Sequence, residues 1–93
     1  MTKEEFNKIP LNGAFLFYSD LCKQCDSVKT ELNKRIDNLN MVLCDEDPDF
    51  FWKIHKVDLI PCVRYYDNGV MIFEKLYKLE DSDYAKLVEL TSK

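Results

Sequence analysis

Four cysteines, Cys22, Cys25, Cys44 and Cys62, carry most of the chemistry that this sequence could perform. Cys22 and Cys25 form a C-x-x-C motif, whereas the other two stand alone, so the second pair of a zinc ribbon is missing. The first residues do not read as a signal peptide, and in a reducing compartment such a motif indicates redox catalysis or metal binding. We expect redox chemistry at Cys22 and Cys25. A zinc ion or iron–sulfur cluster held by these two residues and Cys62 is the alternative.

The two cysteines of the motif are expected to play different parts. The pattern places Cys22 in a loop and Cys25 in the first turn of a helix, where free N–H groups and the helix dipole favour a thiolate. Lys23 acts in the same direction, so we predict that Cys22 attacks a disulfide of another protein. Cys25 then attacks the mixed disulfide and releases the reduced product.

The elements around this motif follow from the apolar pattern. The continuous apolar run at residues 14–18 predicts a strand that is covered on both faces, and residues 41–44 predict a second strand. Between them, apolar residues at steps of three and four from Cys25 to Leu39 predict a helix.

A second helix is predicted from Asp47 and Pro48, which supply an N-cap and a first-turn proline, to about Lys56. Phe51 and Ile54 are expected to face the core in this helix. Phe50, Phe51 and Trp52 cannot all point inward, so one of them is a candidate for contact with a partner.

A hairpin is the strongest turn signal in the sequence. Asp67-Asn68-Gly69 separates the strand-like runs 62–66 and 70–74, and Asn-Gly tolerates the positive φ angles of a tight turn. Asp81 or Ser82 is expected to cap a final helix. Thr2 with Glu5 has the form of a capping box, which indicates an optional helix at residues 2–8.

The resulting order, β-α-β-α-β-β-α, predicts one α/β domain over residues 1–93. Right-handed crossovers make the first two strands parallel, and the hairpin adds antiparallel strands to the same sheet. We therefore expect a three-layer α/β/α sandwich with a four-stranded mixed sheet.

Ile60-Pro61 is a second candidate for function. Proline is tolerated at the first residue of a strand. If the bond is cis, it turns the chain beside the Cys22 loop and presents the backbone of Ile60 to an extended substrate, as in strand addition. An ordinary trans proline that begins the strand is the alternative.

These residues together resemble the thioredoxin family from about Ala14 to the end of the chain. The matching segments are Phe17 to Cys25, Asp45, Ile60-Pro61 and Asp67-Asn68-Gly69. The resemblance implies a thioredoxin fold, a cis Pro61, Cys22 as the attacking thiol and Cys25 as the resolving thiol. It also implies reduction of protein disulfides through a Cys22–Cys25 disulfide, with no bound cofactor and with electrons from an NADPH-dependent flavoprotein reductase of the thioredoxin reductase kind.

The sequence also departs from the thioredoxin pattern. Leu21 stands where thioredoxins usually have Trp, Lys23-Gln24 replace Gly-Pro, Leu16 replaces a buried Asp, and Cys62 replaces a Thr. A glutaredoxin-like protein that uses glutathione is an alternative, although the Thr-Val-Pro and Gly-Gly signatures of glutaredoxins are absent. A thioredoxin-fold interaction subunit with a vestigial site is another.

Several single residues remain open. Cys62 is a small core residue, a secondary redox thiol that modulates the site, or a third metal thiolate. Cys44 is expected to be inert in the core, and His55 is expected on the surface of the second predicted helix.

Composition bounds the partners. The net charge is −4, with 13 basic and 17 acidic residues, which argues against nucleic acid as a partner. No apolar run approaches the roughly 20 residues of a membrane span. We expect a cytoplasmic monomer whose partners are protein disulfides and a reductase.

Overall fold

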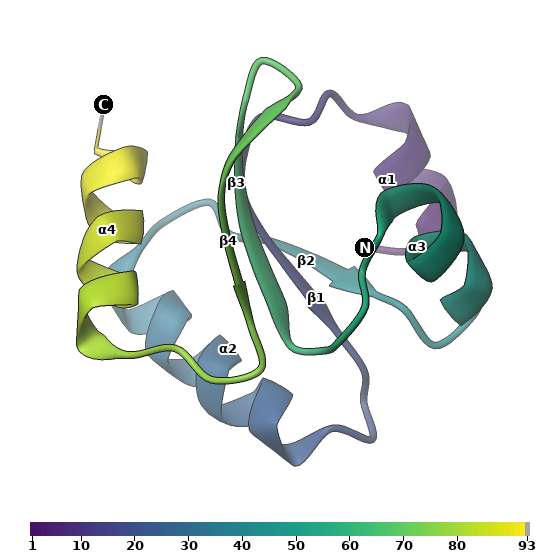
Figure 1. Cartoon of the computed structure of the whole chain (residues 1–93), viewed down its shortest axis with the longest axis horizontal. Helices are drawn as coiled ribbons and strands as arrows, with labels where there is room; N and C mark the ends of the chain where they lie inside the picture. The colour runs from purple at the N-terminus through teal and green to yellow at the C-terminus, as the bar shows by residue number, and fades with distance from the viewer. Residues whose placement is uncertain (93) are drawn as a thin grey trace.

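The computed structural model describes residues 1–92, and its strands form one mixed sheet in the order β2-β1-β3-β4 (Figure 1). Lys93, the last residue of the predicted domain, lies outside the described residues. The predicted order of elements is confirmed, and the optional first helix is present. The elements are α1 (Lys3–Lys8), β1 (Gly13–Tyr18), α2 (Lys23–Arg35), β2 (Asn40–Leu43), α3 (Pro48–His55), β3 (Cys62–Asp67), β4 (Val70–Leu76) and α4 (Asp81–Thr91).

Strand β1 is central because its residues are apolar on both faces. It pairs in parallel with β2 and antiparallel with β3. Phe15 and Phe17 point into a core cluster that includes Phe6 of α1 and Phe51 of α3. The alternate residues of β1 point to the other face, where α2 and α4 contribute the second cluster, which contains Ala14, Leu16, Val28, Leu32, Tyr84 and Leu87. The sheet therefore separates α1 and α3 from α2 and α4, as Figure 1 shows, and the three-layer prediction is confirmed.

The structure corrects three predictions about helices. Helix α2 ends at Arg35, because Ile36 is extended and Asn38 turns the chain with φ 59°; the apolar stripe continues beyond the helix. In α3, Phe51 is buried but Ile54 is 64% exposed, because the single buried stripe of this short helix passes through Phe51. Helix α4 has Glu80 as its N-cap rather than Asp81 or Ser82, and the amide of Glu80 donates to Oδ2 of Asp83 at 2.8 Å.

The ends of the strands fix where a site can form. Registers pair Phe17 with Cys62 and Cys62 with Leu76, so the end of β1, the start of β3 and the end of β4 meet at one edge of the sheet. This is the lower edge in Figure 1, and we call it the site edge. The predicted hairpin lies at the opposite edge, with φ 49° at Asn68 and φ 88° at Gly69.

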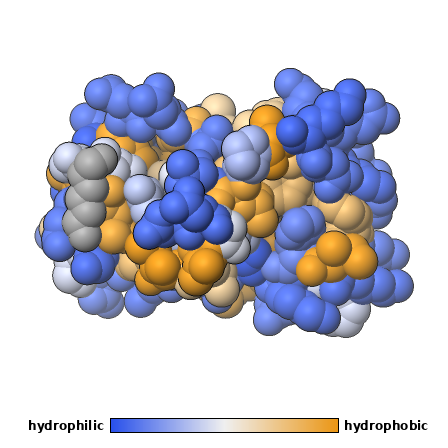
Figure 2. Space-filling model, turned by 90° about the horizontal axis from the view of Figure 1, so that it is seen from above, coloured by the Kyte–Doolittle hydropathy of each residue, from blue (hydrophilic) through white to orange (hydrophobic). Residues whose placement is uncertain are grey.

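The face seen from the hairpin side is mainly hydrophilic (Figure 2). Seen from the hairpin side, apolar surface shows between hydrophilic residues (Figure 2). On β4, an edge strand, Val70, Met71 and Ile72 are exposed. No helix within residues 1–92 combines the length and the apolar character that crossing a membrane requires.

Candidate active site at the Cys22–Cys25 disulfide

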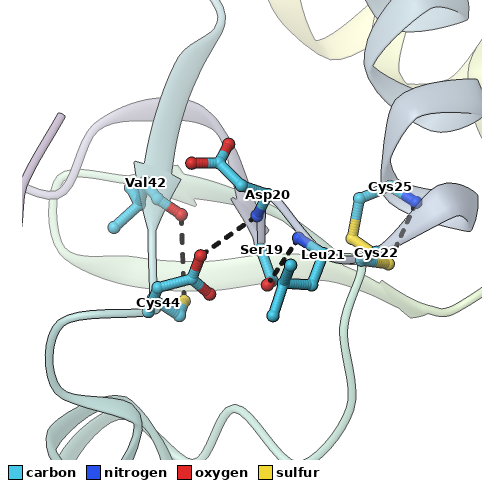
Figure 3. Close-up of a disulfide and its surroundings, with 8 residues drawn as sticks. Ser19, Asp20, Leu21, Cys22, Cys25, Val42 and Cys44 are labelled. Carbon is cyan, nitrogen blue, oxygen red and sulfur yellow. Dashed lines mark hydrogen bonds between the residues drawn. A yellow bond between two sulfur atoms is a disulfide. The ribbon is translucent and has the colours of Figure 1, made fainter.

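Cys22 and Cys25 are joined in a disulfide at the site edge, with their Cα atoms 5.2 Å apart (Figure 3). Cys22 is the N-cap of α2, and its Sγ accepts a hydrogen bond from the amide of Cys25 at 3.1 Å. The amide of Cys22 donates to the carbonyl of Ser19 at 3.1 Å, and the amide of Leu21 donates to Oγ of Ser19 at 3.1 Å. These bonds fold the residues between β1 and α2 into a tight loop.

The two sulfur-bearing residues differ in accessibility. Cys22 is half-buried, whereas Cys25 is buried completely. Lys23, the first residue of α2, is exposed, and Leu21 is 93% exposed directly before Cys22. Cys22 is therefore the cysteine that a partner can reach, whereas Cys25 is covered by its surroundings.

The second predicted site segment reaches the same edge. The Ile60–Pro61 peptide bond is cis, and Pro61 is buried while Ile60 is half-buried. The carbonyl of Pro61 accepts from the amide of Tyr77 at 2.7 Å. Within residues 1–92, the backbone of Ile60 takes part in no loop hydrogen bond.

A groove of about 410 Å³ adjoins these segments on the α3 side. Its apolar wall includes Phe51, Trp52 and Leu59. Ser19, in the loop after β1, and Ile60, before the cis proline, also line the groove. Its lining also includes Asp45, Asp49 and Asp58. Sequence reasoning did not find this groove, although it left open that one of the adjacent aromatics contacts a partner; Trp52 is 54% exposed.

The remaining cysteines, Cys44 and Cys62, are free and buried. Burial raises the pKa of both Cys44 and Cys62 to about 12. In Figure 3 the Ser19–Leu21 segment separates Cys44 from the disulfide. Cys62 packs in the core with its Sγ 3.7 Å from Oε2 of Glu74. At neutral pH both are thiols, and no three His, Cys, Asp or Glu side chains within residues 1–92 form a group that could hold a metal ion.

Arg64 is a buried charged residue that sequence reasoning missed. It lies in β3, is 3% exposed, and pairs through Nε with Oε2 of Glu74 at 2.7 Å. Its other donors reach the carbonyls of His55 and Lys56, where α3 ends. The sequence did contain a signal, because Arg64 is a charged residue within the otherwise mostly apolar run 62–66. The alternation of a strand does not by itself indicate that this charge is buried.

His55 is not a surface residue as predicted, because it is half-buried between aromatic rings. Its ring centroid lies 4.8 Å from that of Phe6 and 5.1 Å from that of Phe50. Burial, followed by the charge of Arg64, lowers the pKa of His55. A third aromatic ring, that of Phe51, has its centroid 6.4 Å from that of His55.

Comparison with known proteins supports the fold. No protein-family model matches the chain, and no curated protein matches its sequence. Among solved structures, the thioredoxin of Malassezia sympodialis aligns over 97% of this chain and 86% of its own, with a TM-score of 0.76 at 15% identity. Mitochondrial thioredoxin 3 of Saccharomyces cerevisiae, in its oxidised form, aligns over 98% and 89%, with a TM-score of 0.65 at 22% identity. Thioredoxin 1 of Thermosipho africanus aligns over 83% and 90%, with a TM-score of 0.65 at 20% identity.

The chain therefore has a thioredoxin fold, as the resemblance of its motifs implied. Within that fold, its C-x-x-C disulfide lies at the N-terminus of α2, and a cis proline precedes β3 at the same end of the sheet.

Proposed function

We propose that this protein is a thiol–disulfide oxidoreductase that reduces disulfides of other proteins. The observation that carries the proposal is the pairing of an accessible Cys22 sulfur, which caps α2, with a buried Cys25 one turn further on. A helix N-terminus stabilises a thiolate, so reduced Cys22 is suited to attack.

The reaction balances without a bound cofactor. The Cys22 thiolate attacks one sulfur of the substrate disulfide, a Cys22–substrate disulfide forms, and the other substrate sulfur leaves as a thiolate that takes a proton from water. Cys25, as its thiolate, attacks Sγ of Cys22 and displaces the second substrate sulfur. Two electrons pass to the substrate, and the Cys22–Cys25 disulfide results.

The substrate chain is proposed to lie across Ile60 and Pro61. The amide and carbonyl of Ile60, which make no loop hydrogen bond within residues 1–92, can pair with an extended segment around the substrate disulfide. The neighbouring groove offers apolar surface for a side chain of that segment. Lys23 is proposed to favour the thiolate of Cys22, and Cys62 to act only as a buried neighbour.

An external two-electron donor must restore the dithiol. We propose an NADPH-dependent flavoprotein reductase of the thioredoxin reductase kind, and glutathione is the alternative donor. Action as a monomer in the cytoplasm is part of the same proposal.

The test is reduction of insulin disulfides, run once with thioredoxin reductase and NADPH and once with glutathione. Cys22→Ser should abolish turnover, while Cys25→Ser should trap a mixed disulfide with the substrate. Cys44→Ala is the matched control and should retain activity. Turnover that survives Cys25→Ala but is lost in Cys62→Ala would move the resolving role to Cys62, and a stoichiometric metal in protein purified with protected thiols would overturn the enzymatic proposal.

A further inference from the structure

Arg64 is buried in the sheet although it is charged, with only 3% of its surface exposed. Taking a guanidinium out of water is costly, and apolar residues of similar volume often stabilise a fold as well as a buried ion pair does. A buried charge is therefore weak evidence of a contribution to stability alone. The hydrogen-bond partners of Arg64 indicate what else this side chain fixes.

These partners connect the two ends of one loop. Nη1 and Nη2 of Arg64 donate to the carbonyls of His55 and Lys56, where α3 ends. Nε donates to Oε2 of Glu74 at 2.7 Å, which holds the guanidinium against β4. Arg64 itself stands in β3, shortly after Pro61. The chain that runs from the end of α3 to the cis proline is therefore closed by a side chain from the strand that follows it.

The middle of this loop has little other support. At its start, the amide of Val57 donates to the carbonyl of Phe51 at 3.0 Å. At its end, the carbonyl of Pro61 accepts from the amide of Tyr77 at 2.7 Å. Within residues 1–92, the backbone of residues 58–60 makes no loop hydrogen bond. The position of residues 58–60 thus depends on the anchors at the two ends, and the buried guanidinium supplies the anchor on the α3 side.

We propose that Arg64 is a positioning residue for substrate docking, which holds the loop before the cis proline in the conformation that presents Ile60 to a substrate polypeptide. This inference rests on the proposed function. The partners of Arg64 are Glu74, Tyr66 and the two carbonyls of α3, so it acts through the loop rather than on the reacting sulfur atoms. A substrate that docks on an ordered loop avoids the entropy cost of ordering it, whereas a loose loop has to be ordered at each encounter.

The kinetic test compares a protein substrate with a small one. It measures kcat and KM with insulin, and the second-order rate constant with cystamine, a disulfide without a polypeptide to dock on the loop. Arg64→Met, which removes every donor, should raise KM for insulin roughly tenfold and leave kcat and the cystamine rate constant unchanged. Arg64→Lys keeps the charge but not the fork of donors, so it should raise KM about threefold. If Arg64→Met does not fold, Arg64→Lys decides by the same comparison.

Leu87→Ala is the matched control for lost stability. Leu87 is fully buried in α4, on the other face of the sheet, and its truncation destabilises the fold by leaving a cavity in the second core cluster. This control should leave KM for insulin unchanged. Rates are compared at a temperature at which circular dichroism shows each variant to be folded, so that unfolded protein does not contribute.

NMR relaxation tests the loop itself, without any substrate. In the wild type, the backbone amides of residues 58–60 should have order parameters of about 0.85, as in rigid backbone, and in Arg64→Met these should fall below about 0.6. Leu87→Ala should keep the wild-type values.

Rigid residues 58–60 in Arg64→Met would overturn the proposal, as would an unchanged KM for insulin, an equal rise of KM in Leu87→Ala, or equal losses with insulin and cystamine. In each of these cases the wild type still turns over insulin, so the proposed function stands. A wild type that reduces neither disulfide with any donor would overturn the proposed function and, with it, the docking role of Arg64.

Discussion

Arg64 and His55 are joined by a hydrogen bond from Nη1 to the main-chain carbonyl of His55 at 2.7 Å, although one lies in β3 and the other ends α3. Nη2 donates to the carbonyl of Lys56 at 3.0 Å, and Nε pairs with Glu74 of β4. One guanidinium therefore holds the end of α3 against β3 and β4. The loop that presents Ile60 starts and ends at elements that this side chain ties together.

Replacing Arg64 by Met should lower the free energy of unfolding by about 3 kcal/mol, because it leaves carbonyls at the end of α3 without their donors. Arg64→Lys should recover only part of the loss, since an ammonium cannot reproduce the fork of donors. Urea unfolding measures both values.

Lys86→Met is the control for this measurement. Lys86 pairs with Glu89 on the exposed surface of α4, with side chains 50% and 62% exposed. Removal of that pair should cost less than about 0.5 kcal/mol. Equal losses in Arg64→Met and Lys86→Met would contradict the role given to Arg64.

Thiol labelling should separate the four cysteines of the reduced, folded protein. The pKa of Cys44 and of Cys62 is raised to about 12, so at about pH 8 only about one in 10⁴ of these groups is a thiolate. Iodoacetamide should therefore modify Cys22 first and leave both buried thiols unmodified, as peptide mass spectrometry would show. Unfolding in urea should make every cysteine reactive. Modification of Cys62 as fast as Cys22 in the folded protein would refute its assignment to the core.

Stability should depend on the protonation of His55. Because its pKa in the folded state is lowered, the unfolded chain binds more protons, and the free energy of unfolding must fall as pH drops below the unfolded value of about 6.5. The pKa values of Asp47 and Glu5 are also lowered, so those groups titrate at more acidic pH. We expect lower stability at about pH 5.5 than at about pH 7.5, and a smaller difference in His55→Gln. If the wild type and His55→Gln lose the same stability between about pH 7.5 and about pH 5.5, the pH dependence arises from other groups.

Trp52 should report occupancy of the groove, because it is the one tryptophan of the chain and lines that groove while 54% exposed. A peptide that docks there should change its fluorescence. Because Asp45, Asp49 and Asp58 line the groove, a peptide with lysines beside its apolar residue should bind about twofold to fivefold more tightly than a version with glutamates. Asp58→Lys should reduce that preference. Equal affinities of the wild type for both peptides would show that the groove carboxylates do not select a basic peptide.

The order of elements was predictable because local signals specify it. The apolar run at 14–18 can be satisfied only by a strand covered on both faces, and Asn68-Gly69 favours one kind of turn. The C-x-x-C pair was found because its chemistry depends on spacing along the chain. These are properties of neighbouring residues.

Features that depend on distant partners were not predictable. Arg64 is stable in the core only because carbonyls from α3 and a carboxylate from β4 meet it there. The orientation of Trp52 and Ile54 depends on which side of α3 faces the sheet. The consecutive aromatic residues Phe50, Phe51 and Trp52 do not indicate that side, because any of them could be buried. The positive φ of Tyr77 occurs where its amide donates a hydrogen bond to the carbonyl of Pro61, and no local sequence pattern predicts that bond.

The hairpin turn at Asn68 and Gly69 lies at the far edge of the sheet from the disulfide, where it is hydrogen-bonded to Leu11 and Asn12. Nothing within 4 Å would meet a side-chain carbon at Gly69, although its φ of +88° makes this position itself costly to substitute. A chemical tether placed beside it, at exposed Asp67, would orient every molecule with Cys22 toward solution. A layer of the protein immobilised in this way would present its redox group uniformly, as an electrode coating or an affinity resin requires.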